Sequence, residues 1–287
     1  MSLRIGSRYI QNLDYIIRLK SFWNSIKELS VRTEIIINVL NNGGSMEYSK
    51  TKYKLFPTLS PYISIDRFEK LKEDHKFIMK KIQSLFNKDS AISIVDIGCG
   101  NGEFLYHLKK AFPNCKLTGF DLTEEFINTG KNFPGLKGVR LEQKDFLEVD
   151  EIFDLVICSG MFHIFTDIKQ PIEKFLSICK GGGYLFVDGL FNEYDIEVRM
   201  QYCDNSNPIS KGIWRSDWNQ HSQSSVKNFL KGIVEYVEFE EVVFDLELPM
   251  NAAMPINKWT FKDSKGKTVI TNGTHLISNK TLMMIKK

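Results

Sequence analysis

The feature that most constrains this chain is a glycine-rich turn at residues 96–102, which reads Asp-Ile-Gly-Cys-Gly-Asn-Gly. The turn follows a short β-branched run and precedes a helical segment that starts at Glu103, so it is expected to join a strand to a helix. Glycine lets the backbone turn tightly and approach a ligand without a Cβ in the way. This order predicts an α/β fold with a ligand at the turn.

Position 103 separates the two ligand classes that use turns of this kind. A dinucleotide pattern counted from Gly98 needs its third glycine at position 103, where this chain has glutamate. An acidic side chain at the start of the helix would also repel a pyrophosphate. The carboxylate of Asp96 suits a ligand that carries an ammonium or sulfonium group. A nicotinamide-dependent oxidoreductase is therefore disfavoured.

Residues 91–190 alternate β-branched runs with helical segments, which predicts a parallel sheet with helices on both faces. The expected strands are 92–97, 116–121, 138–143, 153–159 and 184–190, and the expected helices are 103–112, 124–132 and 168–180. Later in the chain we expect a strand over 234–248, a hairpin over 258–271 and a last strand over 281–285. An earlier helix is expected from Asp66 to about Phe86.

The turn resembles the first motif of the class I S-adenosylmethionine-dependent methyltransferases. The resemblance implies that the turn wraps the methionine part of the cofactor S-adenosyl-L-methionine, and that S-adenosyl-L-homocysteine is the product. The residues that it assigns to this part of the cofactor site are Asp96, Gly98, Cys99, Gly100 and Gly102.

Further matches follow in the order that this family has. The resemblance assigns Asp121 and Leu122, after the second strand, to the ribose, where a carboxylate can accept hydrogen bonds from both hydroxyls. It assigns Asp145 and Phe146, after the third strand, to adenine, and Ser159, after the fourth, to the methyl-group side. A helix cap for Asp121 and a surface turn for Asp145 are the alternatives. The turn at 181–183 resembles the family's turn before the fifth strand, with Gly181 replacing a proline.

The resemblance also implies the overall architecture. We expect a Rossmann-like, mostly parallel seven-stranded sheet with helices on both faces and an antiparallel last strand. Residues 1–90 are expected to form an N-terminal helical lid, and residues 91–287 the methyltransferase core. Substrate-side insertions are expected at about 191–222 and 250–275.

The acceptor side offers fewer signals, because methyl transfer needs positioning and a dry site more than an elaborate catalytic set. A hydroxyl or protonated amine acceptor still needs a base, and His163, just after the fourth strand, is the candidate base or substrate contact. His75 lies in a charged stretch and is expected to be solvated. The candidate substrate contacts, for which packing on the core is the alternative, are Trp214, Trp218, His221 and Arg199.

Composition is that of an ordinary globular protein, with 287 residues, 43% hydrophobic and 25% charged, and a net charge of +3. No basic run typical of nucleic-acid binding is present. The five cysteines include no Cys-x-x-Cys pair, so we expect reduced thiols, no metal site and a cytoplasmic protein. No apolar stretch reaches the roughly 18 residues that span a bilayer, so no membrane partner is expected. The sequence leaves open whether the chain forms a homodimer.

The expected function is transfer of a methyl group to an oxygen, nitrogen or carbon atom of a small molecule. The alternatives are an RNA or protein methyltransferase and a non-catalytic regulatory protein that binds the cofactor. Residues 159–162 read Ser-Gly-Met-Phe and not an Asn-Pro-Pro-Tyr-like signature, which argues against the first alternative. The presence of Asp96, Asp121 and Asp145 argues against a protein that has lost cofactor binding, but it does not decide whether the protein catalyses methyl transfer.

Overall fold

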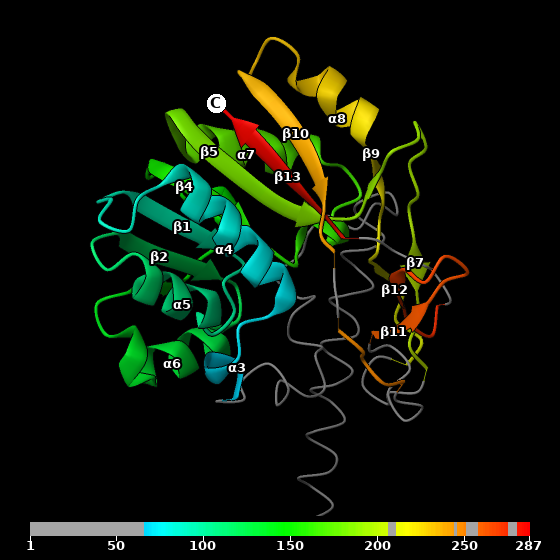
Figure 1. The fold of residues 1–287 in the computed structure, drawn as a ribbon, viewed down its shortest axis with the longest axis horizontal. Coiled ribbons are helices and arrows are strands. Elements are labelled where there is room, and N and C mark those ends of the chain that lie inside the picture. Colours follow the sequence, from blue (N-terminus) through cyan, green and yellow to red (C-terminus); the bar gives the residue numbers. More distant parts are fainter. Residues whose placement is uncertain (1–65, 206–210, 244–245, 251–257, 275–279) are drawn as a thin grey trace, which may run out of the picture. The chain divides into compact units, whose positions relative to one another are not determined.

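The computed structural model describes residues 66–205, 211–243, 246–250, 258–274 and 280–287 (Figure 1). Residues 1–65 of the expected N-terminal lid lie outside the described residues. Residues 251–257 and 275 of the expected insertion at 250–275 also lie outside them.

A seven-stranded sheet forms the centre of the described chain, in the order β10-β13-β5-β4-β1-β2-β3 (Figure 1). Its strands are β1 (Ser93–Ile97), β2 (Lys116–Asp121), β3 (Arg140–Gln143), β4 (Phe153–Cys158), β5 (Cys179–Gly189), β10 (Tyr236–Glu241) and β13 (Thr281–Lys286). Strands β1 to β5 are parallel to one another, whereas β13 runs antiparallel between β5 and β10. The predicted mostly parallel sheet with an antiparallel last strand is confirmed.

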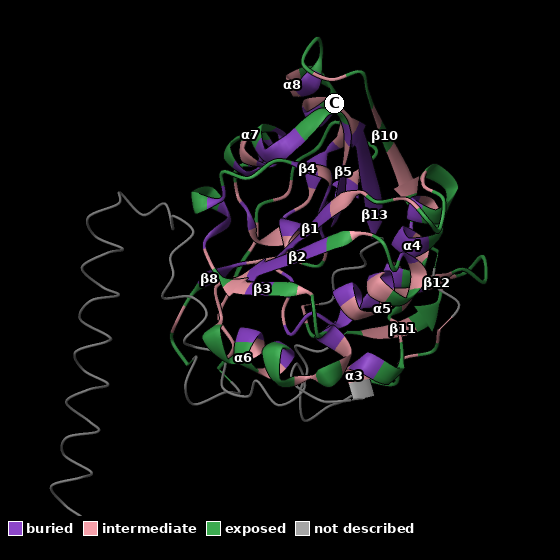
Figure 2. Ribbon diagram, turned by 90° about the vertical axis from the view of Figure 1, so that its left-hand side faces the viewer, coloured by how far each residue is buried: buried purple, intermediate pink, exposed green. Residues whose placement is uncertain are grey.

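Helices cover both faces of the sheet, which explains why its central strands are apolar throughout (Figure 2). The helices on one face are α4 (Glu73–Leu85), α5 (Glu103–Ala111) and α6 (Glu124–Asn132), and α7 (Lys169–Ile178) lies on the other. On the first face, Leu155 and Phe186 from the sheet share one buried cluster with Ile78 and Phe104 from the helices. This cluster holds α4 and α5 beside the glycine turn.

The single helix expected from Asp66 to Phe86 is wrong. The structure has two helices, α3 (Asp66–Glu69) and α4, because Lys72 adopts an extended backbone with ψ of 153°. The strand expected over 234–248 is shorter than predicted, since β10 ends at Glu241 and Val243 beyond it is 73% exposed. The turn expected at 181–183 lies inside β5 as an irregularity of its pairing with β4.

Short elements follow the fifth strand. They are β6 (Phe191–Asn192) paired with β9 (His221–Ser222), β7 (Gln201–Tyr202) paired with β8 (Arg215–Ser216), the helix α8 (Gln223–Leu230), and β11 (Trp259–Lys262) paired with β12 (Thr268–Thr271). The last pair is antiparallel and confirms the predicted hairpin over 258–271. In the described part of the chain, no helix combines the length and the apolar character that a membrane crossing requires. The cysteines are free thiols, and Cys99, Cys158 and Cys179 are buried.

Candidate active site

Polar residues gather where the five parallel strands end. Asp96 lies at the end of β1, Asp121 closes β2, Asp145 follows β3, Ser159 follows β4, and Asp188 lies at the end of β5. Because the carboxyl ends of parallel strands meet at one edge of a sheet, these side chains share the edge at which open α/β sheets bind ligands.

The glycine turn is held by backbone hydrogen bonds. The N–H groups of Gly98 and Cys99 donate to the carbonyl oxygen of Phe120, at 2.8 and 3.1 Å. Gly98, Gly100 and Gly102 all have positive φ, which favours glycine. A Cβ at Gly100 would find no other atom within 4 Å, so the backbone there faces open space. The turn therefore forms a cradle that a ligand can approach closely.

Asp96 is the buried carboxylate of this cradle and is 4% exposed. No hydrogen bond from the described residues stabilises its charge. Burial, opposed by the Lys72 ammonium and reinforced by the charges of Asp121 and Glu103, raises its pKa to about 8. The carboxyl group is thus protonated at neutral pH until a cation approaches.

Asp121 ties the glycine turn to the second strand. Its Oδ2 accepts a hydrogen bond from the Gly100 N–H at 2.9 Å, and its Oδ1 accepts one from the Thr123 N–H at 2.8 Å. Burial raises the pKa of the carboxyl group, and these backbone donors lower it. A carboxylate has about four lone-pair sites, so two such bonds leave Asp121 able to accept from a further ligand.

Asp145 caps the 3₁₀ helix Phe146–Glu148, because its Oδ1 accepts a hydrogen bond from the Leu147 N–H at 3.0 Å. The side chain of Phe146 is 4% exposed and packs against the ring of Phe175, with centroids 5.3 Å apart. The site role predicted for this pair stays a prediction, and the side chain of Phe146 belongs to the core.

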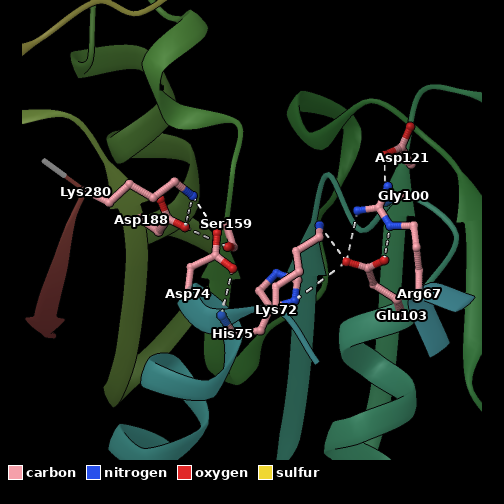
Figure 3. A network of polar contacts seen from close by, with 10 residues as sticks. All are labelled: Arg67, Lys72, Asp74, His75, Gly100, Glu103, Asp121, Ser159, Asp188 and Lys280. Carbon is pink, nitrogen blue, oxygen red and sulfur yellow. Dashed lines mark hydrogen bonds and ion pairs between the residues drawn. The ribbon is translucent and has the colours of Figure 1, made fainter. Parts of the chain in front are cut away.

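A charged cluster around Glu103 escaped the sequence analysis. Arg67 donates to both carboxylate oxygens of Glu103, and the Lys72 ammonium lies 2.5 Å from Oε1 (Figure 3). Burial raises the pKa of Glu103, but Lys72 and Arg67 outweigh it and bring the pKa below its usual range. These contacts bind the α3–α4 junction to the helix that follows the turn. Partners 31 and 36 residues away leave no local signal in the sequence.

The expected solvation of His75 is wrong. The side chain is 7% exposed and its ring stacks on Phe104, with centroids 4.3 Å apart. Helical spacing explains this, because His75 lies on the same face of α4 as the buried Ile78 and Ile82. Burial lowers its pKa to about 4, so the imidazole is neutral at physiological pH.

A second charged cluster lies at the ends of β4 and β5. Lys280 donates to Asp74 Oδ2 at 2.6 Å and to Asp188 Oδ2 at 3.0 Å (Figure 3). The hydroxyl of Ser159 also donates to Asp188 Oδ2, at 3.0 Å. Ser159 was expected at the cofactor, and its observed contact is with this cluster. Asp74, Asp188 and Lys280 did not stand out in the sequence, since they lie far apart there and none belongs to a recognised motif.

His163 is held at its ring and at its backbone. The ring Nε2 lies 3.2 Å from Asp217 Oδ1, and Asn219 donates to the His163 carbonyl oxygen through its backbone N–H (2.9 Å) and its side-chain amide (3.0 Å). Trp218, between the two, has a φ of +52°, which is rare for a residue with a large side chain. The segment expected to contribute aromatic contacts thus contributes a carboxylate and an amide to His163.

The four candidate substrate contacts differ in exposure. Trp214 is 61% exposed, whereas Trp218 is 8% exposed and packs against Tyr202. His221 is 2% exposed, and its Nε2 lies 3.1 Å from the Phe165 carbonyl oxygen, which fits the alternative of packing on the core. Arg199 is 3.9 Å from Glu197. Their substrate roles stay predictions.

Comparisons with known proteins agree with this geometry. A family model described as a methyltransferase domain matches residues 88–236. A malonyl-[acyl-carrier protein] O-methyltransferase of Bacillus cytotoxicus is 26% identical over 143 residues, which is 49% of this chain and 50% of that protein. A tRNA U34 carboxymethyltransferase of Campylobacter hominis is 28% identical over 150 residues, 47% of this chain and 50% of that protein. The chain spans about half the length of these relatives.

Among solved structures, a Haloferax volcanii complex of the Trm112 methyltransferase activator with a methyltransferase matches with a TM-score of 0.51 and 16% identity. The match covers 79% of this chain and 96% of that one, and it supports the fold. The family model itself covers just over half of the chain, including the glycine turn and all five parallel strands. The chain therefore belongs to the methyltransferase domain family, among the class I S-adenosylmethionine-dependent methyltransferases.

Proposed function

We propose that this chain transfers a methyl group from S-adenosylmethionine to an oxygen, nitrogen or carbon atom of a small-molecule acceptor. The observation that carries the proposal is Asp96, a buried carboxyl group beside an open glycine cradle with no hydrogen bond from the described residues. Such a group is costly to ionise unless a cation pairs with it. The ligand that fits is cationic at this point.

Four residues would hold the cofactor. Asp96 suits the ammonium group of its methionine part, Asp121 the ribose hydroxyls and Asp145 the adenine amino group. The side chain of Lys72 is exposed, and its ammonium lies 2.5 Å from Glu103 Oε1 and lowers the pKa of Asp96. An exposed cation at this place suits the cofactor's carboxylate. The bound cofactor supplies a methyl group on a positively charged sulfur atom. The chain's own task is to bind, orient and exclude water.

The pair formed by His163 and Asp217 is our candidate for proton removal from the acceptor. A carboxylate on Nε2 fixes the orientation of the imidazole and stabilises its protonated form. The hydrogen bond from the Asn219 side chain to the His163 carbonyl oxygen holds the imidazole beside the end of β4. The imidazole of His163 would take the proton of a hydroxyl or amine acceptor, and the cofactor would give up its methyl group and leave as S-adenosylhomocysteine.

A small acceptor is favoured because the polar groups at the ends of β4 and β5 are enclosed. Asp188 is 1% exposed and Lys280 is 8% exposed. Reduced and buried cysteines agree with a cytoplasmic place for the reaction. A nucleic-acid acceptor, suggested by the name of one relative, has no described feature in its favour.

Calorimetric titration tests the cofactor proposal directly. We expect wild-type protein to bind S-adenosylmethionine and S-adenosylhomocysteine at micromolar concentrations and NAD not at all. Asp121→Ala should weaken both adenosyl ligands by about tenfold or more, as expected for loss of a carboxylate hydrogen bond. Absence of adenosyl binding in the wild type would overturn the proposal. Turnover is then tested with radiolabelled cofactor against a small-molecule extract and, in parallel, total tRNA.

A further inference from the structure

The cluster of Asp74, Ser159, Asp188 and Lys280, here named the β5 cluster, continues the polar edge that begins at Asp96. Asp96 pairs with Ile157 on β4, and Ser159 lies two residues further on the same face. Cys158 pairs with Val187, so Ser159 is the neighbour of Asp188. Asp96, Ser159 and Asp188 thus share one face of three adjacent strands, with Ser159 and Asp188 two residues further toward the carboxyl ends than Asp96.

A second observation places the two carboxylates on either side of the end of β4. Burial raises the pKa of the Cys158 thiol well above its usual value, and the charges of Asp96 and Asp188 raise it further. Asp121 and Asp145, the other carboxylates of the cofactor site, lie on the opposite side of Asp96 because β2 and β3 follow β1 in the sheet order. Asp188 therefore lies on the side of Asp96 away from the nucleoside end of the proposed cofactor.

The hydrogen bonds within the β5 cluster are uneven. Asp188 Oδ2 accepts from both Lys280 and Ser159, whereas Oδ1 is buried and accepts no hydrogen bond. Asp74 and Asp188 share the Lys280 ammonium, and the charge of Lys258 also acts on both carboxylates. A buried carboxylate oxygen without a donor is unfavourable. The cluster is thus complementary to a ligand that brings an N–H or O–H donor.

We propose that Asp188 Oδ1 accepts a hydrogen bond from the nucleophilic group of the methyl acceptor, which makes this group an amine. One N–H of an amine donates to Oδ1 while another proton passes to His163, whereas a hydroxyl has only one hydrogen. The inference rests on the proposed function and narrows its acceptor class. Lys280 and Ser159 hold Oδ2 and thereby turn Oδ1 toward the acceptor. A carboxylate acceptor has no hydrogen to donate to Oδ1, and a carbon acceptor offers no donor of comparable strength.

The proposal can be tested without knowing the acceptor. Sinefungin, a cofactor analogue with an amine in place of the transferable methyl group, presents an ammonium where the acceptor would approach. S-adenosylhomocysteine lacks this group and reports the cofactor site alone. We expect wild type to bind sinefungin about 10- to 100-fold more tightly than S-adenosylhomocysteine, the range for a hydrogen bond between charged groups. Isothermal calorimetry on both ligands measures this preference.

Asp188→Asn is the main variant, and it leaves Lys280 paired with Asp74. We expect the sinefungin preference to fall by tenfold or more while affinity for S-adenosylhomocysteine stays within about threefold. Asp74→Asn is the matched control, because it removes the same charge from the same lysine but not the oxygen in question. Its preference should stay that of wild type.

Ser159→Ala is a milder variant for the case that Asp188→Asn does not fold. It removes only the hydroxyl that fixes the carboxylate, and we expect about a threefold loss of preference. Equal affinity of wild type for the two ligands would overturn the inference, and so would equal losses in Asp74→Asn and Asp188→Asn. Failure of wild type to bind S-adenosylhomocysteine would refute the proposed function instead, so the two failures are distinguishable.

Discussion

The two halves of the polar edge are built in opposite ways. At the ends of β1 to β3, the carboxylates of Asp121 and Asp145 hold backbone N–H groups within a few residues or one strand of themselves. At the ends of β4 and β5, Asp188 is held by Lys280, 92 residues away, and Lys280 by Asp74, 206 residues away. The first half is a local construction repeated along the sheet, and the second is an assembly of distant segments.

This difference separates two tasks. A site for one invariant cofactor can be encoded in a compact motif, because its ligand never changes. The β5 cluster draws on the first turn of α4, on the ends of two central strands and on the segment before β13, so the proposed acceptor side depends on several distant segments. The comparison predicts that substitutions in the β5 cluster affect stability first and that substitutions near Asp96 affect cofactor binding first.

The largest effect is expected from Lys280→Met. Removing the ammonium takes from Asp74 and from the buried Asp188 the one lysine among the described residues that forms an ion pair with both, a loss of about 3–5 kcal/mol in the free energy of unfolding. Urea denaturation measures it, and Lys286→Met is the control, since that lysine lies at the far end of the strand that follows Lys280 and contacts the exposed Gly182 carbonyl. Equal stability of the two variants would show that the cluster contributes nothing.

The next effect is a loss of cofactor affinity in Asp96→Asn. Without the carboxylate, the ammonium of S-adenosylhomocysteine loses its buried countercharge, and we expect roughly a 100-fold weaker Kd, in line with charged hydrogen bonds. Asp154→Asn at the opposite end of β4 is the control and should bind within about threefold of wild type. A comparable loss in both would point to a general structural effect.

A pH dependence follows from the same residue. Burial, with Asp121 and Glu103, raises the pKa of Asp96 to about 8 against the effect of Lys72. The neutral form therefore dominates below pH 8, and affinity for S-adenosylhomocysteine should rise from pH 6 to pH 8. Because the folded-state pKa is raised, the cofactor-free protein loses stability as the pH rises through this range. Asp96→Asn should therefore have the higher Tm at pH 8, and a pH-independent affinity would contradict the assignment.

The smallest effect is expected from Lys72→Met. Its side chain is 44% exposed, so solvent screens its charge and we expect about a tenfold loss of affinity for S-adenosylhomocysteine. 5′-Methylthioadenosine lacks the carboxylate and should bind both proteins equally. If both ligands weaken together, Lys72 acts through the Glu103 cluster and not on the ligand.

Local patterns in the sequence predict much of this molecule. The glycine turn, the five parallel strands and the last strand are each visible because their residues lie within one short segment, whereas the antiparallel direction of the last strand was implied by the resemblance to the methyltransferases. The split between α3 and α4 was missed, since nothing in the composition near Lys72 marks its extended backbone. The burial of His75 was missed because the charged residues around it concealed the apolar face that it shares with Ile78.

The acceptor side could not be predicted from spacing. Asp188 looks like an ordinary polar residue at the end of a strand until Lys280 is placed beside it by the sheet order. His163 stood out by its position after β4, yet the carboxylate that pairs with it lies 54 residues further along. Pairs of this kind form because the strand order of the sheet brings distant segments together, and local sequence patterns do not reveal that order.

The position of β13 has a consequence for biosynthesis. This strand enters between β5 and β10 and carries Lys280 to the β5 cluster. A ribosome that has produced the glycine turn and all five parallel strands still has about 90 residues to synthesise before the acceptor side can close. Until Thr281–Lys286 emerges, the nascent chain can assemble a cofactor cradle but not the ion cluster beside it. The ion cluster of the proposed catalyst can therefore form only after β13 has been synthesised.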